Sequence, residues 1–91
     1  ALADAGASVS LAEELELARA YLAIEQVRFG QRLRLRWEVD TAACRARVPP
    51  LLLQPLVENA VRHGVEPAAG GAEIVVSARL HHGQAQVQVD N

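Results

Sequence analysis

The residues with the most informative chemistry lie in one short segment, residues 54–64, with the sequence QPLVENAVRHG. Helical spacing of three and four places Asn59, Arg62 and His63 on one face. An amide oxygen is a hard neutral ligand suited to Mg²⁺, and a guanidinium or imidazole beside it can meet phosphates. The spacing therefore predicts either a nucleotide site or an ordinary surface helix with a Glu58–Arg62 ion pair. The residues expected to cover the opposite, packed face are Leu53, Leu56, Val57, Ala60 and Val61.

The amino-acid sequence of the segment favours the nucleotide site. It closely resembles the N-box of bacterial sensor histidine kinases of the LytS/YehU type, whose ATP-binding domain belongs to the GHKL superfamily. The resemblance extends upstream through residues 13–16, 21–25 and 28–30 and downstream to residues 87–91, so it covers nearly the whole chain.

The resemblance implies a role for each matching residue. Asn59 matches the asparagine that holds the Mg²⁺ bridging the ATP phosphates, and Arg62 and His63 match residues near those phosphates. Asp90 opens what looks like the first glycine box, where a buried carboxylate accepts a hydrogen bond from the adenine amino group. The alternative for Asp90 is simply the polar end of a strand. Related ATPases that activate water carry a general-base glutamate at the position of Pro55, so that route is absent here. Glu58 is then expected first as the ion-pair partner of Arg62 and second as a catalytic residue that assists the acceptor histidine.

The function implied is that of a two-component sensor kinase in a phosphorelay. The parent protein would bind Mg-ATP, autophosphorylate a histidine and pass the phosphoryl group to the receiver domain of a response regulator, acting as a homodimer. The rest of the first glycine box, the second glycine box, the ATP lid and the phosphoacceptor histidine are not matched here, so the fragment alone is expected to be inactive. The alternative is a degenerate nucleotide-binding or dimerisation module that has lost catalysis.

Composition is consistent with one small domain: the chain has 91 residues, is 51% hydrophobic and carries a net charge of -2. The charge argues against a nucleic-acid partner, and the basic cluster Arg28, Arg32, Arg34 and Arg36 is interpreted as a solvated strand face. No run of 18 apolar residues exists, so we expect no membrane contact by this segment. The resemblance implies the cytoplasmic portion of an integral inner-membrane protein.

The elements that must position the site can also be predicted. Ser10 and Glu13 form a capping box that starts a helix, and Gly30 should end it. This helix carries two apolar stripes, which predicts either two packing partners or a helix buried on one side of its own domain. The first stripe is Leu11, Leu15, Ala18 and Leu22, and the second is Leu17, Tyr21, Ile24 and Val27.

Strands are predicted on either side of the N-box helix. Residues 33–40 alternate apolar and charged, which predicts a strand with Trp37 in the core. The N-box helix should begin near Gln54, after Pro49-Pro50, and stop at Gly64. Residues 74–80 and 85–89 should form a hairpin joined by the four-residue loop 81–84.

The predicted fold class is α+β: part of a two-layer GHKL α/β sandwich preceded by a linker helix. Residues 1–30 would be the C-terminal part of the dimerisation and linker region, and residues 31–91 the N-terminal part of the ATP-binding domain. His81 and His82 invite a metal-site hypothesis, but adjacent histidines should diverge in extended chain, and Cys44 lies in an unrelated segment.

Overall fold

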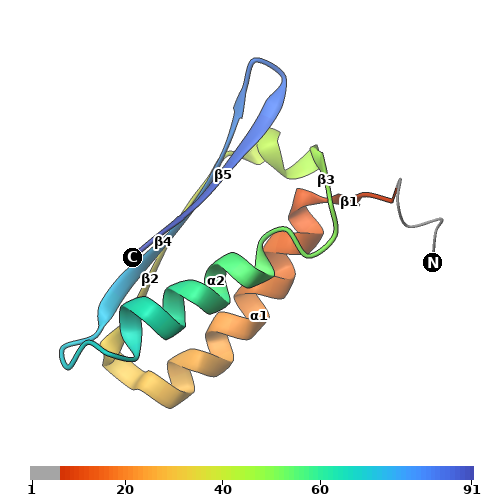
Figure 1. Ribbon diagram of the computed structural model, residues 1–91. Coiled ribbons are helices and arrows are strands. Elements are labelled where there is room, and N and C mark those ends of the chain that lie inside the picture. Colours follow the sequence, from red (N-terminus) through yellow and green to blue (C-terminus); the bar gives the residue numbers. More distant parts are fainter. Residues whose placement is uncertain (1–6) are drawn as a thin grey trace.

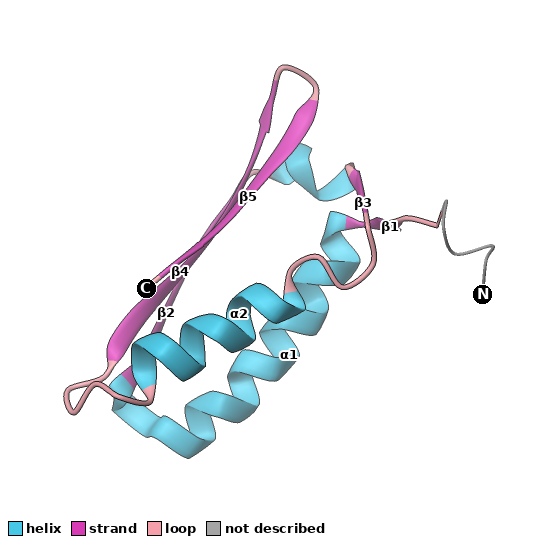
Figure 2. Cartoon of the chain, viewed as in Figure 1, coloured by secondary structure: helices cyan, strands magenta, loops and turns pink. Residues whose placement is uncertain are grey.

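The computed structural model describes residues 7–91, and the first six residues of the expected linker region lie outside this part. Two helices cover one face of a three-stranded sheet (Figure 1), and Figure 2 shows the same two layers by element type. The sheet has the order β2-β4-β5, with β2 Leu33–Val39, β4 Ala72–His81 and β5 Gln84–Asp90. The expected small α+β arrangement, with helices on one face of a mixed sheet, is confirmed.

The sheet is mixed because its two pairings have different connections. β2 and β4 are parallel, with Trp37 opposite Val76, and the crossover between them contains the second helix. β4 and β5 are antiparallel and form a hairpin, with Val76 opposite Val89. Because β5 pairs only with β4 in the described part, its other edge is open.

The hairpin turn is tighter than predicted. His81 pairs with Gln84, so His82 and Gly83 alone make the turn, and both have positive φ, at 50° and 78°. This is the two-residue turn that matches the twist of antiparallel strands. The predicted four-residue loop was therefore wrong. Leu80 alternates along β4 with the buried Ile74, Val76 and Ala78 but is 44% exposed, because β4 extends beyond the helices here.

Helix α1, Leu11–Phe29, begins and ends where the sequence predicted. Ser10 Oγ accepts from the Glu13 amide at 3.2 Å, and Glu13 Oε1 accepts from the Ser10 amide at 3.1 Å. Gly30 follows with a φ of 59°, a left-handed conformation that favours glycine. Before α1, the short strand β1 Val9–Ser10 pairs with β3 Arg47–Val48, and a 3-10 turn, η3 Thr41–Arg45, precedes β3.

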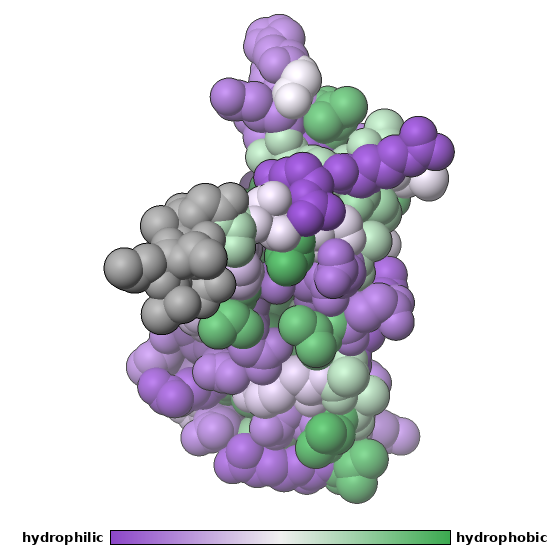
Figure 3. Space-filling view, turned by 90° about the vertical axis from the view of Figure 1, so that its right-hand side faces the viewer, coloured by the Kyte–Doolittle hydropathy of each residue, from purple (hydrophilic) through white to green (hydrophobic). Residues whose placement is uncertain are grey.

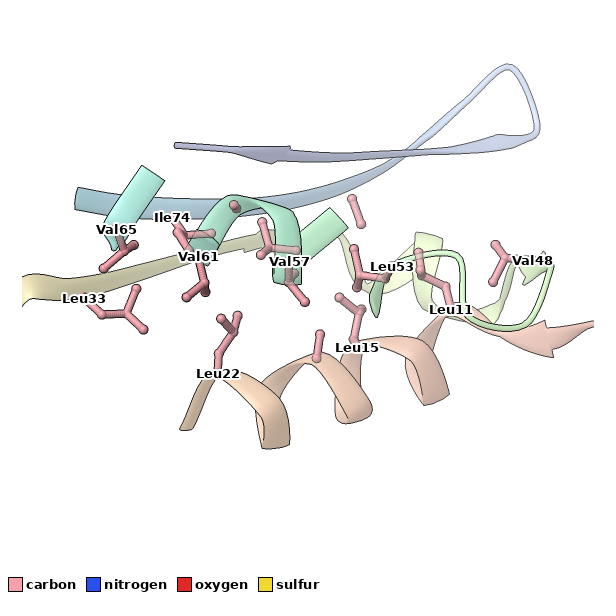
Figure 4. Close-up of a cluster of buried hydrophobic side chains, with 14 of the residues drawn as sticks. Leu11, Leu15, Leu22, Leu33, Val48, Leu53, Val57, Val61, Val65 and Ile74 are labelled. Atoms are coloured by element: carbon pink, nitrogen blue, oxygen red, sulfur yellow. The ribbon is translucent and has the colours of Figure 1, made fainter. Parts of the chain in front are cut away.

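The core lies between the two helices and the sheet, and Figure 4 shows side chains from both helices meeting there. The first predicted stripe of α1 is fully buried. Three of the four residues of the second stripe are not covered: Leu17 is 53%, Ile24 70% and Val27 87% exposed. The fourth, Tyr21, is partly buried against the core. Figure 3, which views the side of the molecule carrying α1, shows apolar side chains standing in a mainly polar surface. Leu17, Ile24 and Val27 therefore remain largely uncovered within the described residues.

The structure refines one prediction about an aromatic residue and corrects one about a charged residue. Trp37 packs against the core as predicted but is only partly buried, and the Arg19 guanidinium carbon lies 4.3 Å from the centroid of its ring. Arg32 does not belong to a solvated strand face. It precedes β2, and its Nη2 donates to the carbonyl oxygens of Val65, Glu66 and Ala68 at 2.9, 3.2 and 2.7 Å. Arg32 thus fixes the chain that leaves the second helix.

Candidate nucleotide-binding site

The segment predicted as the N-box forms α2, Gln54–Ala60, followed without a break by a π-helical turn, η4 Val61–Val65. One face is buried against α1 and the sheet, where Leu53 and Val57 are fully enclosed (Figure 4). Leu56, predicted on that face, is 43% exposed. It lies only one residue before Val57, about 100° around the helix, which turns it toward solvent.

The polar residues of this helix point away from the core. Asn59, Arg62 and His63 are all exposed, as their spacing predicted. The ion pairs within residues 7–91 use Arg28 and Arg36, so Arg62 keeps its charge available to a ligand. An exposed amide beside an unpaired cation fits a Mg²⁺ ion and the phosphates that it would bridge.

The predicted ion pair between Glu58 and Arg62 is not formed. Glu58 Oε2 instead accepts a hydrogen bond from Gln54 Nε2 at 3.0 Å, one turn earlier in α2. Hydrogen bonds between side chains four residues apart are as natural on a helix as ion pairs. Glu58 is therefore directed toward the start of α2, and Arg62 toward solvent.

Asp90 lies at the end of β5 and is exposed rather than buried. Its two carboxylate oxygens accept from Gln88 Nε2 at 3.2 and 2.9 Å. Within the described residues no element covers this edge of the sheet, so the carboxylate is open to solvent, and its adenine-binding role stays a prediction.

The end of β5 nevertheless lies against the candidate helix. Asn91 Nδ2 donates to the Ala60 carbonyl oxygen at 3.4 Å, and a Cβ added at Gly64 would overlap the Asn91 side chain. Ala60 follows Asn59 and Asn91 follows Asp90, so the structure brings two predicted parts of the site, 31 positions apart, to one place.

Gly64 therefore has a different role from the one predicted. The helical turn continues past it to Val65, and the Glu66 amide donates to the Val61 carbonyl oxygen at 3.0 Å, as a π-helical turn requires. Gly64 does not stop the helix. Its missing side chain makes room for the end of β5 instead.

One residue that contacts this region, Glu14, was not predicted from the sequence. Glu14 of α1 is buried, 4% exposed, and its carboxylate accepts from the amides of Leu51 and Leu53, both at 3.1 Å. A signal was present, since Glu14 lies three residues after Leu11 and four before Ala18, on the apolar stripe. An acid at such a position requires a partner.

The histidine pair of the hairpin gives no metal site. The rings of His81 and His82 lie 4.0 Å apart, contrary to the expected divergence, because the positive φ of His82 turns the chain. Within residues 7–91 no three histidine, cysteine or acidic side chains gather in a way that could hold a metal ion.

Comparison with known proteins identifies relatives that are sensor proteins and histidine kinases. The profile of the family described as Histidine kinase matches residues 1–33. Sensor histidine kinase YpdA of Escherichia coli K12 is 39% identical over 69 residues, which are 76% of this chain and 12% of that protein. Sensor protein LytS of Enterococcus faecalis is 36% identical over 76 residues, 81% of this chain and 13% of that protein. This chain belongs to the LytS-type sensor histidine kinases.

A further relative extends the match over most of the chain. Sensor histidine kinase BtsS of Escherichia coli K12 is 32% identical over 83 residues, which cover 91% of this chain and 15% of that protein. The chain thus spans about an eighth to a seventh of the length of these sensor kinases. Neither helix of residues 7–91 combines the length and the apolar character needed to cross a bilayer.

Proposed function

We propose that this chain supplies the linker helix and the first part of the ATP-binding domain of a sensor histidine kinase. Residues 1–30 would form the end of the dimerisation and linker region, and residues 31–91 the start of a GHKL-type α/β sandwich. The observation that carries the proposal is the exposed cluster Asn59, Arg62 and His63 beside the C-terminal end of β5.

Residues of α2, η4 and β5 would bind Mg-ATP together. The Asn59 amide oxygen would hold the Mg²⁺ ion, which when bound neutralises charge on the phosphates. Arg62 and His63, one turn further along the same exposed face, would hold phosphate oxygens by charge and hydrogen bonding. Asp90 would accept a hydrogen bond from the adenine amino group once further chain covers the edge of β5.

Phosphoryl transfer to histidine requires little base catalysis, because a neutral imidazole is already a nucleophile. This is consistent with Pro55 at the position where a water-activating ATPase carries its glutamate. Glu58 is exposed one residue before Asn59 and is the residue available to assist the acceptor imidazole. The chemistry then depends on positioning and electrostatics.

The full protein would autophosphorylate a histidine and pass the phosphoryl group to the receiver domain of a response regulator. The uncovered stripe of Leu17, Ile24 and Val27 on α1 supports a homodimer, since a second copy of the helix could cover it. By the same resemblance, the parent would be an inner-membrane protein with this segment in the cytoplasm.

The test is Asn59→Ala in the full-length protein. We expect autophosphorylation by labelled ATP to fall at least about 100-fold, the scale for losing one group that stabilises transition-state charge. The fold should be retained, because Asn59 is exposed, and circular dichroism would check this. The matched control is Gln84→Ala, which removes an exposed amide at the far end of the hairpin. Unchanged activity in Asn59→Ala would refute the metal-binding role. Absence of autophosphorylation in the unsubstituted protein as well would favour a degenerate binding module.

A further inference from the structure

The buried carboxylate of Glu14 joins the two helices. It belongs to α1, yet Oε2 accepts from the Leu51 amide and Oε1 from the Leu53 amide, each at 3.1 Å, across 37 and 39 positions of sequence. Both oxygens are used by the turn that leads into α2. A buried carboxylate is tolerated only where such partners are supplied, so the two segments are matched to each other.

The turn that Glu14 holds is not fixed by its own sequence. Leu51 has a φ of 60°, a left-handed conformation that is disfavoured for leucine. Leu53, the residue that caps α2, makes no side-chain cap hydrogen bond, and Pro55 in the first turn has no amide to donate. The start of α2 therefore depends on an acceptor from another element.

We propose that Glu14 is a positioning residue for the candidate nucleotide site. By fixing the turn at residues 51–53 it sets the residue at which α2 begins, and with it the direction in which Asn59 and His63 leave the helix. This inference rests on the proposed function, because it assigns Glu14 a part in Mg-ATP binding.

The geometry of a helix makes the start position important. A shift of one residue rotates every side chain by about 100°, which would move Asn59 off the exposed face. The hydrogen bond between Asn91 and the Ala60 carbonyl would be lost by the same rotation. A contact at the beginning of α2 can thus control groups one and two turns away.

The experiment compares Glu14→Gln with Glu16→Gln in the full-length protein. Glu16 is exposed on the same helix, so both variants remove one negative charge from α1. Amide hydrogen exchange would be measured at Leu51 and Leu53, and the dissociation constant for Mg-ATP alongside it. We expect exchange at both amides to be at least about 10-fold faster in Glu14→Gln, as for loss of a hydrogen bond to a charged acceptor.

Nucleotide binding separates positioning from simple destabilisation. We expect the Mg-ATP dissociation constant to rise about 5-fold or more in Glu14→Gln. Ala18→Gly, a buried change on α1 that also lowers the melting temperature, should leave it within about 2-fold. Leu51→Gly added to Glu14→Gln should restore part of the affinity, because glycine adopts positive φ without support from a carboxylate.

Three results would overturn the proposal. One is equal exchange at Leu51 and Leu53 in Glu14→Gln and Glu16→Gln. Another is an affinity loss in Ala18→Gly as large as in Glu14→Gln. The third is a Glu14→Gln protein that does not fold even with Leu51→Gly, which would make Glu14 a general stabiliser. Absence of Mg-ATP binding by the unsubstituted protein would refute the proposed function itself, and the exchange comparison would then still show whether the contact fixes the turn.

Discussion

Arg32 offers the sharpest test of how the end of the candidate helix is held. Its Nη2 donates to the carbonyl oxygens of Val65, Glu66 and Ala68, directly after the π-helical turn. Replacement by methionine keeps an apolar stem of similar length and removes the donors. We therefore expect Arg32→Met to release this segment and to destabilise the protein.

The size of the effect follows from the contacts. Nη2 carries two hydrogens, so two of the three hydrogen bonds can be made at full strength, at about 1.5 kcal/mol each for a charged donor. Arg32 Nε is buried without a partner, and its removal returns about 1 kcal/mol. The net loss is about 2 kcal/mol, against a total stability of about 5 to 14 kcal/mol for a chain of this length. The melting temperature should fall by about 8 to 16 °C.

The assay is thermal unfolding of the 91-residue chain followed by circular dichroism, with Arg34→Met as control. Arg34 is exposed and makes one long contact, 3.4 Å from Nη1 to the Gly70 carbonyl oxygen, so its loss should change the unfolding free energy by about 0.5 kcal/mol or less. Equal melting temperatures for the two variants would show that the carbonyl contacts of Arg32 contribute no net stability.

Two further predictions concern the start of α1 and the start of β4. Hydrogen bonds from the backbone and side chain of Ser10 lower the pKa of Glu13 below its ordinary value of 4.5, so their stabilisation is present above that pH and is lost as pH falls through the folded-state pKa. In Glu13→Gln the free energy of unfolding should therefore fall less as the pH is lowered below 4.5, which urea titrations at several pH values would measure. The same pH dependence in Glu13→Gln and the unsubstituted protein would show that the capping box contributes nothing. Gly71 has a φ of 78° and its added Cβ would overlap the backbone of Arg32, so Gly71→Ala should cost about 2 kcal/mol or more in urea unfolding. The control is Gly70→Ala, where the added Cβ meets open space and stability should change by about 0.5 kcal/mol or less. Similar losses of stability in Gly71→Ala and Gly70→Ala would contradict a close approach of Gly71 to the Arg32 backbone.

Much of the candidate site could be predicted because helical periodicity is a local property. The spacing of Asn59, Arg62 and His63 fixed their common face before any tertiary contact was known, and all three are exposed. What the spacing could not predict is the partner of Glu58, since Gln54 and Arg62 are equally placed, one turn to either side. Asp90 likewise has an exposure set by the elements around it rather than by its own strand.

Elements whose ends are made by residues close together in the chain could be predicted from local patterns alone. The capping box of Ser10 and Glu13, the left-handed Gly30 and the alternation of residues 33–39 each involve residues at most a few positions apart, so their outcome does not depend on packing. The hairpin between β4 and β5 was found for the same reason. Its turn was misjudged by one residue at each end because register depends on cross-strand pairing.

Tertiary structure decided the contacts that join distant segments. Glu14 reaches the turn before α2, Arg32 reaches the carbonyl groups after η4, and Gly64 admits the side chain of Asn91. These partners are 27 to 39 positions apart, and no local pattern records which of them will meet. Their hydrogen bonds form only once the two helices pack on the sheet, because burial makes an unpaired carboxylate or carbonyl group costly and so selects the arrangement in which each finds a partner.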